Sequence, residues 1–384
     1  MRKSGKALFL TFALLIAAAL CGCGPAAEGG ISFPDRNLEA AIREAINKSA
    51  GPICATDLEG ITSLGITFRD ISDLTGIEHC TDLVKFNITW CELRDISPLA
   101  SLTGLEELNL ANNEISDISP LSSLNNLSTL YLEFNQIINI SALSYLTGLT
   151  KLHIYDNQIE DISPLSSLNR LKTLHIYRNN IKDVSPLAGL TELVELKIFD
   201  NQISDISPLS GLQNLKLLYL IDNEINDISP LAGLDNLIDL SIKHNHLNDI
   251  SSLSSLSNLE DLSLDFNEIG DISPLAGLTR ITDLKLVQNN ISDISPLSDL
   301  TGLEFLLLND NQIVDISSLK DLTNLGFLGL CNNQISDLEP LVDNAGLSSG
   351  DEVFLQGNPL SKDSIDEYIP ELEARGVKVT FEQE

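Results

Sequence analysis

The tetrapeptide LHIY occurs twice in the sequence, at residues 152–155 and again at residues 174–177. Its imidazole and phenol groups are chemically distinctive side chains, set between residues that suit a hydrophobic scaffold. Imidazole nitrogens bind metal ions and exchange protons near neutral pH. Tyrosine rings combine a large apolar area with one hydroxyl group, and they are frequent at binding interfaces. Because the two copies lie 22 residues apart, the elements that position these side chains must themselves repeat.

Neither metal binding nor catalysis is the expected chemistry of these residues. His153 and His175 lie close enough on adjacent strands to share a metal ion, with Asp156 nearby, but no third strong ligand has clear geometry. The sequence contains no G-x-S-x-G, H-E-x-x-H, P-loop or G-x-G-x-x-G motif, and no cysteine has a setting typical of a nucleophile. We therefore predict no metal, no cofactor and no enzymatic activity.

The repeat is marked by asparagines at strict 22-residue steps. The repeating unit reads L-x-x-L-x-L-x-x-N-x-I-x-D-I-x-P-L-x-x-L. It resembles the internalin type of the leucine-rich repeat family, and the resemblance covers nearly all of the chain after its N-terminal signal. The implied fold is an α/β leucine-rich repeat solenoid, with a curved parallel β-sheet on the concave face and short 3-10 or helical turns on the convex face. The asparagines, which we call the Asn ladder, are Asn113, Asn135, Asn157, Asn179, Asn201, Asn223, Asn245, Asn267, Asn289, Asn311 and Asn333.

The residue types within one repeat support this fold. Leu152 and Ile154 alternate with polar neighbours, as in a half-buried strand. The ladder Asn is expected to point inward and bond to backbone groups in the turn, with Cys91 filling the same slot one step earlier. In the DISPL segment, Ser is predicted to cap a short convex turn and Pro to begin it. The preceding Asp residues are expected to cap turns and face solvent rather than bind calcium.

The repeats need capping at both ends, because a solenoid exposes its core there. Residues 33–56 carry an amphipathic helix pattern and are predicted to form the N-terminal cap. Residues 57–349 hold about 12 or 13 repeats. Residues 350–384 are predicted to form an α/β C-terminal cap, with a helix around residues 365–375 and a final strand. Capped ends favour a monomer.

The N-terminus has the pattern of an export signal. Three basic residues precede 14 uncharged, mostly apolar residues, 7–20. The following LCGC segment resembles a bacterial lipobox, which implies a signal peptide over residues 1–22, lipid on Cys23 and a flexible tether over residues 23–32. Ordinary signal cleavage and an uncleaved anchor are the alternatives. The lipobox predicts an exported protein anchored to the bacterial cell membrane or outer membrane, facing outside the cytoplasm.

The net charge of the chain limits the classes of partner that it can bind. The chain has 23 Lys and Arg against 55 Asp and Glu, a net charge of −32. Such a field repels nucleic acid and anionic lipid, so lipid on Cys23 is the expected membrane contact.

Cys54 and Cys80, in the N-terminal cap region, could form a disulfide in an exported protein or remain two buried thiols. Cys331 is expected to be a free thiol at an outward strand position.

The variable strand positions carry the candidate site. Two columns of side chains should face the concave side, about 4.8 Å apart from strand to strand. Column A is the strand residue between the two core positions, and column B lies two residues further on. Both columns gather aromatic residues over the same repeats. The predicted binding residues, which we call the aromatic block, are Tyr131, Phe134, His153, Tyr155, His175, Tyr177, Lys197, Phe199, Tyr219 and Ile221.

Three functions remain open from the sequence. Exposed contiguous aromatic residues mark interaction sites, so we expect a recognition module with a protein ligand. The resemblance to internalins also implies protein binding on the concave face. Aromatic rings suit glycans too, which makes a glycan the alternative ligand. In a third hypothesis the protein organises the envelope, and the rings only shield the sheet and pair across strands.

Overall fold

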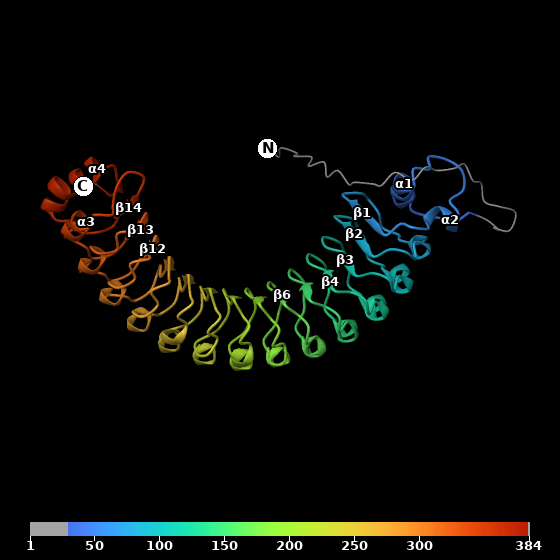
Figure 1. The fold of residues 1–384 in the computed structure, drawn as a ribbon, viewed down its shortest axis with the longest axis horizontal. Coiled ribbons are helices and arrows are strands. Elements are labelled where there is room, and N and C mark those ends of the chain that lie inside the picture. The colour runs from blue at the N-terminus through green and yellow to red at the C-terminus, as the bar shows by residue number, and fades with distance from the viewer. Residues whose placement is uncertain (1–29, 383–384) are drawn as a thin grey trace.

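The repeats build one long, curved sheet. In the computed structural model, which describes residues 30–382, fifteen strands run parallel in strict chain order from β1 to β15. Figure 1 shows an open arc, with the strands along its inner side and the helical turns along its outer side. The predicted solenoid with a concave parallel sheet is therefore confirmed.

The strands are short because each repeat turns away after three to five residues. Each begins 22 residues after the last until the C-terminal end, where the step lengthens. Their bounds are β1 Ser63–Thr67, β2 Lys85–Thr89, β3 Glu107–Asn109, β4 Thr129–Tyr131, β5 Lys151–His153, β6 Thr173–His175, β7 Glu195–Lys197, β8 Leu217–Tyr219, β9 Asp239–Ser241, β10 Asp261–Ser263, β11 Asp283–Lys285, β12 Phe305–Leu307, β13 Phe327–Gly329, β14 Glu352–Phe354 and β15 Lys378–Thr380.

The convex side consists of 3-10 turns at the predicted DISPL segments. One of them spans Ser163–Ser167. Its cap differs from the expected one, because Ser163 is the first residue of the turn and Ile162 holds the cap position without a side-chain bond. The Asp161 carboxylate accepts the Ser163 amide at 2.8 Å instead. The Asp column therefore caps the turns, and the bond lowers the pKa of Asp161.

The core is a continuous stack of aliphatic side chains. In the repeat that follows β5, Leu152, Ile154, Ile159, Ile162 and Leu165 are each at most 1% exposed. Burial of one such side chain stabilises the fold by roughly 1.5–3 kcal/mol before the entropy of ordering the chain is counted. No repeat could bury these residues alone, so each depends on its two neighbours.

The Asn ladder runs inside the coil, beside this core. The Asn135 amide donates to the carbonyls of Leu110 and Leu132, both at 3.0 Å. Its Oδ1 accepts the Ile115 amide at 3.0 Å. One side chain thus ties together backbone groups of two repeats that the turn leaves without backbone partners. Nine of the eleven side chains are buried, while Asn157 and Asn201 are part-exposed.

Helices close both ends of the arc (Figure 1). At the N-terminal end, α1 (Arg36–Ala45) buries Leu38, Ala41 and Ile42, and α2 (Ala55–Leu58) follows it. Asp35 caps α1 by accepting two backbone amides. At the other end lie α3 (Glu339–Asp343), a π-helical turn (Ser364–Tyr368) and α4 (Ile369–Ala374). Within residues 30–382, no helix is long and apolar enough to cross a membrane.

The cysteines correct one sequence hypothesis. Cys80 is a free thiol with no exposed surface, so the disulfide considered between Cys54 and Cys80 does not form. The core of the first repeat takes the Cys80 side chain as a small apolar residue, and burial raises the pKa of its thiol to about 11. Cys331 is a free thiol as predicted. Cys23 lies outside the described residues.

Candidate functional site

Strand register positions the aromatic block on the concave face. Tyr131 pairs with His153, His153 with His175, and His175 with Lys197, so column A runs straight across β4, β5, β6 and β7. Tyr219 continues it on β8. In each of these strands the middle residue is buried and its neighbours are part-exposed. The structure thus brings the column A residues of the prediction together on one surface.

In column A the two imidazoles lie face to face. The rings of His153 and His175 are 4.0 Å apart at an angle of 15°. Tyr131 meets the other side of His153 edge-on, at 5.0 Å and 86°. At the opposite end, the Lys197 ammonium lies 5.3 Å from the centre of the Tyr219 ring, a cation–π contact.

Column B forms a second stack beside the first. Tyr155, Tyr177 and Phe199 lie ring on ring at 4.1 and 4.0 Å, with angles of 13° and 11°. Phe134 meets Tyr155 edge-on at 5.4 Å, and Ile221 follows Phe199 in the column. Because the ring faces in the middle of this stack cover one another, the surface consists largely of ring edges and hydroxyl groups.

Phe134 differs from the other rings in its backbone conformation. It has a φ of 54°, in the left-handed region, where a bulky residue is uncommon. The equivalent positions of other repeats often hold Asp or Asn, which adopt this conformation more readily, as at Asn112 and Asp156. The Phe134 ring is 43% exposed. An aromatic residue here suits neither the backbone nor the core, so it favours a role at the surface.

A small charge network adjoins the histidines. His175 Nε2 lies 2.7 Å from Glu195 Oε1, and the Lys197 ammonium lies 3.1 Å from the same oxygen. Burial lowers the pKa of His175 although Glu195 opposes the shift. For Glu195, burial acts to raise the pKa, but the hydrogen bonds from His175 and Lys197 lower it overall. The pair is therefore a neutral imidazole that donates to a carboxylate.

His153 is held neutral more strongly. Burial, together with the charge of a protonated His175, lowers its pKa to about 3. Its Nε2 atom is buried and has no hydrogen-bond partner, and the same is true of Glu133 Oε2. Burial raises the pKa of Glu133. One of these two polar atoms lies in the aromatic block and the other beside it, and neither has a partner in the fold.

The sequence analysis did not include Glu133 or Glu195 among the site residues. Glu133 lies two residues after Tyr131 and therefore belongs to column B, so the 22-residue period was an available signal. Glu195 belongs to a third concave column, formed by the first residue of each strand. The alternation of a strand puts that residue on the same face as column A.

Beyond β8, several charged groups of the concave face pair with one another, although Ser241 Oγ on β9 is buried without a partner. The Lys243 ammonium pairs with Asp265 at 3.0 Å, and Lys285 pairs with Asp261 at 2.8 Å. Asp265 Oδ1 also accepts the Val287 amide at 2.9 Å. These two ion pairs therefore need no external partner for their charges.

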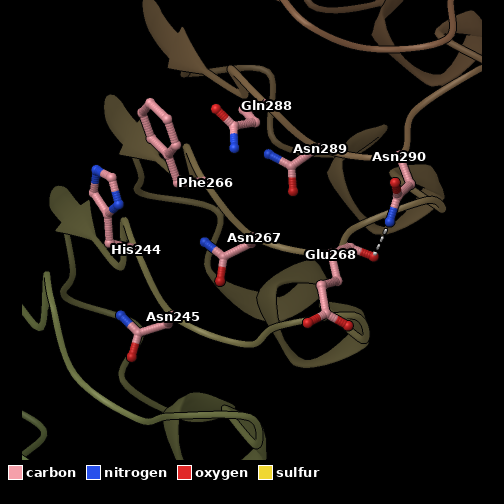
Figure 2. A pocket seen from close by; sticks show the side chains of 8 residues that line it. All are labelled: His244, Asn245, Phe266, Asn267, Glu268, Gln288, Asn289 and Asn290. Carbon is pink, nitrogen blue, oxygen red and sulfur yellow. Dashed lines mark hydrogen bonds between the residues drawn. The ribbon is translucent and has the colours of Figure 1, made fainter.

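A recess of about 400 Å³ lies beyond the C-terminal ends of β9, β10 and β11, beside His244 and Phe266 (Figure 2). These two rings stack at 4.0 Å. Asn245, Asn267 and Asn289 also line it, but their amides are bonded to backbone carbonyls. Across residues 30–382, no group of three or more His, Cys, Asp or Glu side chains could hold a metal ion.

The fold and the ladder together define a class of proteins. Leucine-rich repeat models match residues 103–145, 147–189, 191–233, 235–277 and 301–343, which is more than half of the chain. The protein belongs to the leucine-rich repeat family, and within it the chain is internalin-like.

Several solved structures of leucine-rich repeat proteins are similar to this chain. The internalin InlF of Listeria monocytogenes is 34% identical, with a TM-score of 0.77 over 92% of this chain and 96% of that one. A leucine-rich repeat protein of Leptospira interrogans is 21% identical, with a TM-score of 0.69 over 91% and 100%. The ectodomain of the receptor kinase GASSHO1/SCHENGEN3 from Arabidopsis thaliana is 20% identical, with a TM-score of 0.52 over 81% and 46%. No curated protein sequence matches the chain.

Proposed function

We propose that this protein is an exported, lipid-anchored recognition module that binds a protein partner through the aromatic block. The observation that carries the proposal is the contiguous set of rings in columns A and B, from Tyr131 on β4 to Tyr219 on β8. Tyrosine-rich, part-buried patches of this kind supply binding hot spots. The GASSHO1/SCHENGEN3 ectodomain, which shares the fold, was solved in complex with Casparian strip integrity factor 2.

The geometry of the rings favours a protein over a glycan as the ligand. A sugar ring stacks on the face of an aromatic side chain. In column B, Tyr177 lies between Tyr155 and Phe199 at about 4 Å on each side, so both of its faces are occupied. What remains accessible is ring edges and hydroxyl groups, which suit the mixed apolar and polar contacts of a protein interface.

The test is a pull-down from envelope and environmental protein extracts with the full chain in mild detergent as bait. A repeat-matched variant combines His153→Asn, His175→Asn, Tyr155→Thr and Tyr177→Thr. Asn and Thr already stand in columns A and B at Asn87 and Thr89, so the repeat accepts them. We expect the unmodified chain to retain a partner that the variant loses.

The matched control changes Ser241 and Ser263 to Ala, in column A of β9 and β10. It should retain the partner, with circular dichroism showing that all three chains are folded. Equal retention by the repeat-matched variant would count against the aromatic block as the binding site. It would favour the alternative in which the stacked rings only stabilise the sheet.

A further inference from the structure

Two polar atoms, one in the aromatic block and one beside it, have no partner in the fold. Glu133 Oε2 and His153 Nε2 are both buried and form no hydrogen bond. Glu133 is in column B, two residues after the end of β4, and His153 is in column A on β5. A buried polar atom without a partner destabilises the fold, and a charged group does so more strongly. A bound partner that supplied the missing contacts would offset that cost.

Among the carboxylates of residues 30–382, Glu133 stands out because one of its oxygens is buried without a hydrogen-bond partner, and it also lacks a cation. Glu107 pairs with Lys85 at 2.8 Å, and Glu195 pairs with Lys197 at 3.1 Å. Lys151 acts on the charge of Glu133 from a distance, but its ammonium lies over the Tyr131 ring, 5.2 Å from the centre. Among residues 30–382, Glu133 forms no ion pair.

Aromatic rings flank this carboxylate. Phe134 is the next residue in the chain, and Tyr155 occupies column B on the neighbouring strand. The two rings meet edge-on at 5.4 Å, and Phe134 is 43% exposed. A carboxylate beside aromatic rings attracts a cation through charge and through the ring quadrupoles.

We propose that Glu133, near Tyr155 and next to Phe134 in the chain, is the subsite for a basic side chain, arginine or lysine, of the protein partner. The proposal rests on the proposed function and names the chemistry of its partner. The net charge of −32 favours the same kind of partner, because it draws basic surfaces toward the arc. The concave carboxylates on β9 to β11 already have partners, since Asp261 and Asp265 pair with lysines. Asp239 accepts the Tyr219 hydroxyl, and Asp283 accepts the Thr282 hydroxyl.

The subsite is tested directly with small probes. Saturation-transfer NMR would measure the binding of N-acetyl-arginine methylamide and N-acetyl-lysine methylamide to the full chain. The neutral N-acetyl-citrulline methylamide matches the arginine probe in shape. We expect saturable signals from the two basic probes, no saturable signal from citrulline, and a loss of at least fivefold in affinity in Glu133→Gln.

The control variant is Glu107→Gln, which removes a concave carboxylate that already has a cation. It should bind the basic probes as the unmodified chain does. If Glu133→Gln also binds them unchanged, or if no basic probe gives a saturable signal, the subsite is overturned. The first result would mean that the probes respond only to the diffuse acidic surface.

The two proposals can fail separately. If the repeat-matched variant loses the partner but Glu133→Gln binds it with unchanged affinity, the subsite fails and the proposed function stands. If the repeat-matched variant keeps the partner, the proposed function fails. Glu133→Gln replaces a desolvated carboxylate with a group of the same shape, so its thermal midpoint should not fall. The midpoint therefore separates lost binding from lost folding.

Discussion

At the scale of single residues, the imidazoles of the aromatic block depend on their surroundings for their charge. His153 and His175 face each other at 4.0 Å, part-buried among other rings. Burial lowers the pKa of both, in His153 to about 3. A free histidine titrates near 6.5, so the unfolded chain takes up protons that the folded chain refuses.

The sign of the pH dependence follows from this difference. The stability that the neutral pair contributes is fully present above about pH 6.5 and falls as the pH drops below that value. We expect the urea midpoint of the unmodified chain to fall between pH 7.5 and pH 5.5. The fall should be smaller in the double variant His153→Asn, His175→Asn. Parallel falls in the two chains would contradict a neutral, desolvated pair.

The sequence allowed the composition of this site to be predicted, but not its internal contacts. The 22-residue period assigns His153 to column A and Tyr155 to column B without a structure. Period alone says nothing about ring angles, which depend on rotamers. It therefore could not predict that the faces of Tyr177 are both covered, or that Phe134 has a left-handed backbone. Its failure to include Glu133 has another reason: a carboxylate on a strand looks solvated until its burial is known.

At the scale of the repeat, hydrogen bonds from the Asn ladder and the Asp caps fix the backbone, as long helices or strands do in other folds. Each strand of the central repeats has three residues, too few to fix the next turn by backbone bonds alone. Asn179 donates to three carbonyls, those of Ile154, Ile176 and Tyr177, and accepts the Ile159 amide at 3.0 Å. The Asn179 side chain thus supplies hydrogen bonds to backbone groups that a longer strand would otherwise pair.

Removal of one ladder side chain should therefore destabilise its repeat. Asn179→Ala leaves buried carbonyls and one amide without partners, which should cost at least about 1–3 kcal/mol of unfolding free energy. Urea denaturation measures this loss, and hydrogen exchange at the Ile159 amide locates it. Asn180→Ala is the control, on the exposed neighbour in the same turn. Equal stability of the two variants would show that water replaces the ladder bonds.

At the scale of the whole molecule, the sequence predicted the fold well because one motif determines every repeat. The two ends of the arc were harder to predict. The N-terminal helix and the C-terminal helix and strand lie where amphipathic patterns indicated. Cysteine pairing could not be inferred in the same way, because the first repeat buries Cys80 in its core and a residue count does not show that.

The lipid anchor is also a property of the whole molecule. If Cys23 carries the lipid, Cys23→Ala should move the protein from the membrane fraction to the soluble fraction. The fold should be unchanged, because the helices and strands of the arc all lie after this position. Fractionation after export measures the distribution, and circular dichroism of both chains checks the fold. Recovery of the variant in membranes would overturn the lipobox interpretation.

The strict chain order of the strands has a mechanical consequence. If a lipid on Cys23 anchors the protein, tension would act between its N-terminal end and a ligand held on β4 to β8. The force passes from α1 through the intervening strands, because each strand bonds only to its neighbours in the chain. The strands from β9 to β15 lie outside this path and carry no load. Under tension the N-terminal third of the arc would stretch first, and the C-terminal half would keep its curvature.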